Sequence, residues 1–162
     1  MAHVELTLAP LPAHVRTARL VVVAAARRAG LDDGLVDELR LALGEACSRA
    51  VGLHRKHAPN APVRVTVSDD ATGLTVTVVD EGPAAGPPSG DVAGDLLESS
   101  DADDDDLDYL VDPDVALAVL AGLVDDCEVD ASETGTTVTM RFPLPPRPVG
   151  VSGPGATAAS QA

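Results

Sequence analysis

The feature that most constrains the fold is one long stretch of apolar residues at helical spacing, between residues 32 and 57. Its apolar positions recur every three or four residues, as on one side of a helix. They are Leu35, Leu39, Ala42, Leu43, Ala46, Ala50 and Leu53. Asp32 or Asp33 can cap the start of this helix, and Pro59 and Pro62 mark its end.

Other segments alternate apolar and polar residues, which is typical of strands. Pro10 ends the first of them, and residues 69–73 form a turn of the hairpin type between the second and third. Residues 133–135 form a similar turn between the last two. The predicted strands are His3–Leu8, Val63–Ser68, Leu74–Asp80, Glu128–Ala131 and Thr137–Pro143.

Two further helices complete the pattern. Ala13–Ala29 is followed by Gly30 at a C-cap position, and Asp114–Asp125 follows Asp112 and Pro113, which suit an N-cap and a first turn. The order is therefore β-α-α-β-β-loop-α-β-β. It predicts an α/β two-layer sandwich with helices on one face of a mixed, mostly antiparallel sheet. Several folds share this order, so it does not decide function.

The acidity of the chain is concentrated in one segment. The net charge is −15, residues 91–114 carry eleven acidic and no basic side chains, and the rest carries only −4. An acidic protein lacks the basic footprint of nucleic-acid binding, so we expect no direct DNA or RNA contact. It can still attract a basic protein partner electrostatically. Tyr109 and Phe142 are the only aromatic residues, so Val, Leu and Ala must build the core.

Composition also divides the chain. We expect a folded domain over residues 1–143, in which residues 82–112 form an acidic variable lid loop, with a short helix near Leu107–Val111. Residues 144–162 are rich in Pro, Gly, Ala and Ser and predict a disordered tail.

Cysteine usage and hydropathy indicate a cytoplasmic protein. Cys47 and Cys127 lie in apolar segments and are expected to be reduced core thiols. The N-terminus does not look like a signal peptide, and the longest apolar run, Leu20–Ala26, is too short to cross a bilayer.

Three short motifs carry a family resemblance. Leu41–Val51, with the sequence Leu-Ala-Leu-Gly-Glu-Ala-Cys-Ser-Arg-Ala-Val, resembles the N-box helix of the anti-sigma factor/serine-protein kinase family, within the GHKL (histidine kinase-like, Bergerat) ATPases. Val79–Gly82 is similar to the first glycine box of that family, and Gly135–Val138 to its last motif. Val4–Leu20 resembles its first strand and helix. The similarity covers about residues 3–143, with the motifs in the family's order.

The resemblance implies an ATP site with Mg²⁺. Glu45 matches the catalytic general base, a role that suits a carboxylate on a rigid helix. Asp80 matches the carboxylate that accepts the adenine amino group. Gly82 would let the backbone pass close to the base. Thr136 and Thr137 match hydroxyls near adenine, so these residues are expected to bind nucleotide.

The phosphate end departs from the family pattern. Arg49 stands where the family has an Asn that holds Mg²⁺, so no metal ligand is assigned. Arg49 can pair with Glu45 at i,i+4, worth about 0.2–0.5 kcal/mol, or act as an anion ligand for another nucleotide. Residues 112–114, Asp-Pro-Asp, replace an Arg-containing Gly-x-Gly loop, and Pro87 and Pro88 remove backbone donors. We therefore expect the adenine end to survive and the triphosphate end to be degenerate.

The function implied by the resemblance is regulation of transcription by partner switching. An anti-sigma factor of this kind sequesters a sigma factor and is countered by a STAS-type anti-anti-sigma antagonist. Arg16 and Arg19 on the first helix are the expected partner-binding residues. The free edge of the first strand and the habit of the family favour a homodimer, and no membrane contact is expected.

Two alternatives stay open. The chain can be an active ATP-dependent serine/threonine kinase that phosphorylates its antagonist, with the Asp-rich run recruiting Mg²⁺, although weak or absent activity is expected. It can instead be a nucleotide-sensing regulatory module. His54 and His57 are expected to be part of a solvated helix end rather than zinc ligands.

Overall fold

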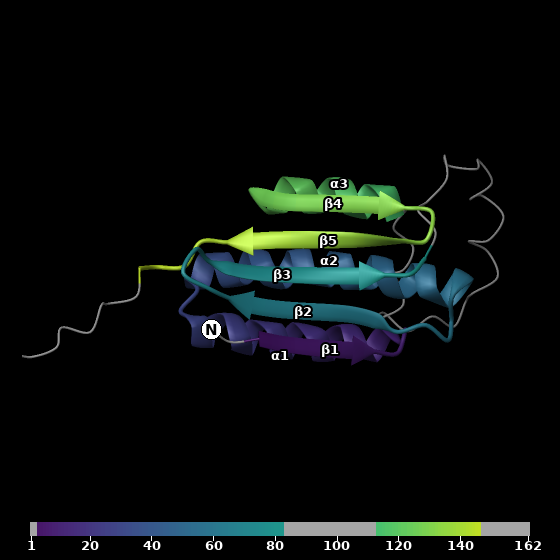
Figure 1. Cartoon of the computed structure of the whole chain (residues 1–162), viewed down its shortest axis with the longest axis horizontal. Coiled ribbons are helices and arrows are strands. Elements are labelled where there is room, and N and C mark those ends of the chain that lie inside the picture. The colour runs from purple at the N-terminus through teal and green to yellow at the C-terminus, as the bar shows by residue number, and fades with distance from the viewer. Residues whose placement is uncertain (1–2, 83–112, 147–162) are drawn as a thin grey trace, which may run out of the picture.

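The computed structural model describes residues 3–82 and 113–146. Within them the chain forms an α/β fold with helices behind one face of a five-stranded sheet, as the sequence predicts (Figure 1). The elements are β1 (His3–Leu8), α1 (Pro12–Ala29), α2 (Asp33–His57), β2 (Val63–Asp69), β3 (Leu74–Asp80), α3 (Pro113–Leu123), β4 (Asp126–Ser132) and β5 (Gly135–Phe142).

The strand order in the sheet is β1-β2-β3-β5-β4. Every neighbouring pair is antiparallel, so the sheet described here is wholly antiparallel rather than mixed. The last strand, β5, lies between β3 and β4, which brings the ends of β3 and β5 together. Helix α2 packs against β3, between α1 and α3. This central position lets α2 reach the place where β3 and β5 meet.

The core lies between the sheet and the helices and is built from small aliphatic side chains. The strand period of two sends every second residue toward the helices, and these residues are buried. Val65, Val76 and Val138 are examples, at 0%, 0% and 2% exposure. On α2 the predicted stripe is buried apart from Leu35, which is half-buried. The expectation of a Val, Leu and Ala core is confirmed.

The other face of the sheet is polar. Thr66, Thr77 and Thr139 form a row across the three central strands, each directly opposite the next. On the edge strand β4, acidic side chains take the same face, at Asp126 and at residues 128 and 130. Arg141 on β5 pairs with two of them, at 3.2 and 3.3 Å. The edge formed by β4 is therefore acidic, whereas β1 has one acidic residue.

The connection between α1 and α2 follows the sequence signals. Gly30 has φ of 93° and donates its N–H to the carbonyl of Arg27 at 3.1 Å, which closes α1. The Asp32 carboxylate accepts the N–H of Gly34 at 2.9 Å and caps α2. These two local contacts turn the chain, so α1 and α2 pack as neighbours on the sheet.

Some of the predicted features lie in segments that the structure does not describe. The acidic segment from residue 83 to residue 112, with its predicted short helix, and the tail from residue 147 onward lie outside the described residues. In the part that is described, none of the helices has the combination of length and hydrophobicity that a membrane crossing needs.

Both cysteines are free thiols. Cys47 on α2 is 1% exposed, and burial raises the pKa of its thiol to about 12, although the nearby Arg19 cation lowers it. Cys127 on β4 is half-buried, and burial followed by the Asp126 charge raises its pKa. The two thiols therefore differ most in their access to solvent.

We expect the alkylating reagent iodoacetamide to label Cys127 in the native protein and to leave Cys47 unlabelled. At pH 8, a pKa of about 12 leaves only about 10⁻⁴ of the Cys47 thiol ionised, and the thiolate is the reactive form. Mass spectrometry of the labelled protein checks this: the wild type should carry one adduct and the C127S variant none, with urea-unfolded protein as the control that labels fully. Rapid labelling of Cys47 in folded C127S would show that the core is open there.

Candidate functional site

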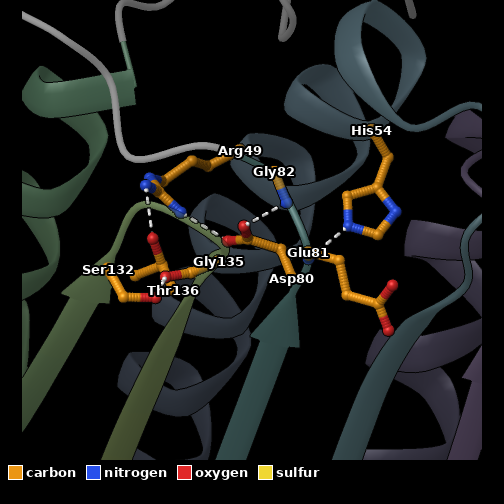
Figure 2. A network of polar contacts seen from close by, with 8 residues as sticks. All are labelled: Arg49, His54, Asp80, Glu81, Gly82, Ser132, Gly135 and Thr136. Atoms are coloured by element: carbon orange, nitrogen blue, oxygen red, sulfur yellow. Dashed lines mark hydrogen bonds and ion pairs between the residues drawn. The ribbon is translucent and has the colours of Figure 1, made fainter.

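A buried polar cluster lies where the end of β3 meets the start of β5 and the middle of α2 (Figure 2). Asp80 and Thr136 are directly opposite each other on β3 and β5, and both face α2. Arg49 extends from α2 toward them. The exposures of Arg49, Asp80 and Thr136 are 6%, 3% and 1%. We call these three residues the Arg49 cluster.

The guanidinium of Arg49 joins the two strands. Its Nη1 donates to Oδ2 of Asp80 at 2.7 Å, and its Nη2 donates to Oγ1 of Thr136 at 3.2 Å. The N–H of Gly82 donates to the other carboxylate oxygen, Oδ1, at 3.1 Å. Both oxygens of Asp80 are thus bonded to protein donors. The Nε of Arg49 is buried and has no partner in the described part of the chain.

Two glycines make this packing possible. Gly135 begins β5 with φ of 155°, and a Cβ there would collide with the carbonyl oxygen of Asp80. A Cβ on Gly82 would lie 2.8 Å from Cβ of Leu53 on α2. The family resemblance implies that Gly82 allows close approach to a nucleobase. In this structure the close approach is to a side chain of the protein itself.

His54 is a second polar residue that α2 directs toward the end of β3. It is 0% exposed, its Nδ1 lies 2.8 Å from the carbonyl oxygen of Ala61, and the N–H of Glu81 donates to its Nε2 at 2.7 Å. These contacts assign a neutral ring with the proton on Nδ1. The expectation of a solvated histidine is therefore wrong for His54. The available signal was its position four residues after Ala50, next to the apolar stripe.

The structure brings together four of the five predicted nucleotide-binding residues: Arg49, Asp80, Gly82 and Thr136. Thr137 lies apart from them, because its side chain shares the polar face of the sheet with Val79 and Asp130. The expectation that Arg49 pairs with Glu45 is wrong, since Arg49 turns toward Asp80. Glu45 lies one turn earlier on α2 and is half-buried. A catalytic role for it stays a prediction.

The expectation of an intact adenine end stays a prediction, and the contacts of Asp80 bear on it. The acceptor expected to receive the adenine amino group, the Asp80 carboxylate, is already bonded through both oxygens. The guanidinium lies beside the hydroxyl of Thr136, which was expected near the base. The departure from the family pattern at Arg49 therefore involves residues that were expected at the base end of the site.

The predicted partner-binding residues differ in surroundings. Arg16 on α1 is exposed. Arg19 is half-buried and packs on α2, where a Cβ at Gly44 would collide with its guanidinium. Its Nε is buried and has no partner among the described residues. Helix α1 carries four Arg and no acidic residue, so its exposed side is basic.

We expect R49A to lower the free energy of unfolding by about 3–5 kcal/mol, because it leaves the Asp80 carboxylate buried without its partner. The double variant R49M/D80N removes both charges and keeps the volume, so it should recover most of the loss. Urea denaturation of the wild type and both variants measures this. A loss below about 1 kcal/mol in R49A would mean that Asp80 is neutral or solvated.

Comparisons with known proteins give the family. Residues 8–142 match the model of the histidine kinase-like ATPase domain. The solved structure of the RsbU and RsbW domains of Rv1364c from Mycobacterium tuberculosis is similar in fold, with a TM-score of 0.60, at 16% identity over 89% of this chain. The chain spans 32% of that longer chain. A search of curated proteins by sequence found no match. Because the family match extends over most of its length, this protein belongs to the histidine kinase-like ATPase domain family.

Proposed function

We propose that this protein is a partner-switching regulator, an anti-sigma factor that binds a sigma factor without needing ATP. The observation that carries the proposal is the Arg49–Asp80 ion pair, 2.7 Å long and buried. We infer that an adenine amino group would reach the Asp80 carboxylate by displacing Arg49, because both side chains are buried against each other. That replacement leaves the guanidinium to find another partner, and breaking a buried pair of this kind costs about 3–5 kcal/mol.

The partner class rests on the resemblance and on charge. The motifs of α2, β3 and β5 resemble the anti-sigma factor/serine-protein kinase family, and the similar solved structure includes an RsbW domain. A sigma factor is a basic, DNA-binding protein, and this chain has a net charge of −15. The exposed Arg16 is the proposed contact on α1, with Arg19 beside it as part of the helix packing. A STAS-type antagonist would compete for the same surface.

Self-association belongs to the same proposal. Strand β1 pairs with β2 on one side, and on its other side none of the described residues pairs with it, so it forms an edge of the described sheet. The edge carries the alternating sequence His-Val-Glu-Leu-Thr-Leu without proline or lysine, the residues that commonly block strand addition. We expect a second copy to pair there. Sedimentation equilibrium tests this, and L6P on β1 should give monomers.

The serine/threonine kinase alternative is supported by one observation. Arg49 bonds to Asp80, so it does not neutralise Glu45, the candidate base. A kinase assay with Mg·ATP and a candidate antagonist separates the two functions. A phosphoserine mass shift that disappears in E45A would favour the kinase.

We expect calorimetry to detect no ATP binding by the wild type at millimolar nucleotide, because the buried Arg49 guanidinium pairs with the carboxylate that would accept the adenine amino group. R49N should behave in the same way, since the acidic run at residues 91–114 remains and repels a triphosphate. Tight binding by R49N alone would show that Arg49 is the whole obstacle. ADP and cyclic dinucleotides in the same assay test the nucleotide-sensing alternative.

Partner binding should depend on α1 and be independent of nucleotide. We expect the purified chain to capture a sigma factor from the native cell with the same affinity with and without Mg·ATP. R16E should weaken the complex about tenfold, because Arg16 is proposed to pair with an acidic side chain of the partner and the change places like charges together. R28E, an exposed arginine in the last turn of α1, is the matched control and should bind almost normally. Capture that requires ATP would contradict the proposal.

A further inference from the structure

The Arg49 cluster has the form of a filled binding site. We infer that Asp80 and Thr136 make a recognition site for a planar guanidinium-type cation, and that the side chain of Arg49 is its built-in occupant. This inference goes beyond the proposed function. It rests on the contacts of described residues and holds whichever protein the domain binds.

The acceptors are arranged for one planar group with two donors. Oδ2 of Asp80 and Oγ1 of Thr136 come from opposite residues of neighbouring strands, and both receive terminal nitrogens of the same guanidinium, at 2.7 and 3.2 Å. The planar fork of a guanidinium matches such a pair, whereas an ammonium is a point charge. The Gly82 N–H holds the remaining oxygen, Oδ1. The Gly82 N–H therefore helps to orient the carboxylate independently of the cation.

The contacts are made by the guanidinium of Arg49, its head group, rather than by its aliphatic chain, which we call the stem. The Nε of Arg49, the one guanidinium nitrogen bonded to the stem, is buried and makes no hydrogen bond with the described residues. Both of the cluster's Arg49 bonds come from Nη1 and Nη2 (Figure 2). A detached guanidinium ion can supply the same two donors. The stem only keeps the head group present at high effective concentration, so a free cation cannot compete in the wild type.

Removing the stem should therefore expose a site for the free ion. In R49A the truncated side chain leaves space beside Asp80, and guanidinium chloride at up to about 20 mM is far below the molar range in which it denatures proteins. We expect it to raise the unfolding temperature of R49A saturably, by about 3–6 °C. Methylguanidinium should act in the same way. The wild type should show no rise.

Four controls make the result specific. R49M also lacks the charge, but its side chain fills the space, so guanidinium should not stabilise it. R49A/D80N keeps the space and loses the acceptor charge, and it should not respond either. Sodium chloride and urea at equal concentration test ionic strength and a neutral molecule of similar shape on R49A.

If R49A is unfolded in the absence of added guanidinium, the same titration is followed as recovery of its far-UV circular dichroism signal. The inference is overturned if R49A shows no saturable response, or if R49M, R49A/D80N or sodium chloride responds equally. Failure to capture a sigma factor would leave this result unchanged, so the two proposals fail separately.

Discussion

The ion pair between Arg49 and Asp80 is the interaction on which the site depends. Transferring two charges to positions 6% and 3% exposed is unfavourable by several kcal/mol for each ion unless they are paired and hydrogen-bonded. The pair meets this condition, and it joins α2 to β3 directly and to β5 through Thr136. Arg49 supplies the internal cation that stabilises the buried Asp80 carboxylate. The Arg at position 49 and the Asp at position 80 therefore act as one unit in the fold.

Much of the fold could be predicted because its signals are local. Apolar residues recur every two positions in the strands and every three to four in the helices, which distinguishes the two. Gly30 marks the end of α1 and Asp32 the start of α2, and the backbone and capping hydrogen bonds of these residues confirm both ends. The antiparallel character of the whole sheet was not predictable in this way. It depends on β5 pairing with β3, about sixty residues earlier in the chain, and no single segment carries that information.

The site was predictable as a group of residues and not as a set of contacts. Motif positions place Arg49, Asp80 and Thr136 together, but helix spacing suggested Glu45 as the partner of Arg49. The long side chain instead reaches a residue 31 positions away. His54 was missed because its partners are the backbone of residues 61 and 81, which have no side-chain signature. The separation of Thr137 from Thr136 was not predicted, because the predicted strand began at Thr137, whereas β5 begins at Gly135 and alternation places the two residues on opposite faces.

The two edge strands of the sheet differ in charge, and this difference limits how many chains can join by strand addition. At β4, Asp126 and the acidic residues 128 and 130 would oppose like charges if two such edges met, whereas β1 has a single acid, Glu5. Adding a second copy through β1 on both chains uses up the permissive edge of each and leaves only repulsive ones outside. Assembly by strand addition would then be self-terminating at two chains, because a head-to-tail fibre requires two permissive edges on every copy.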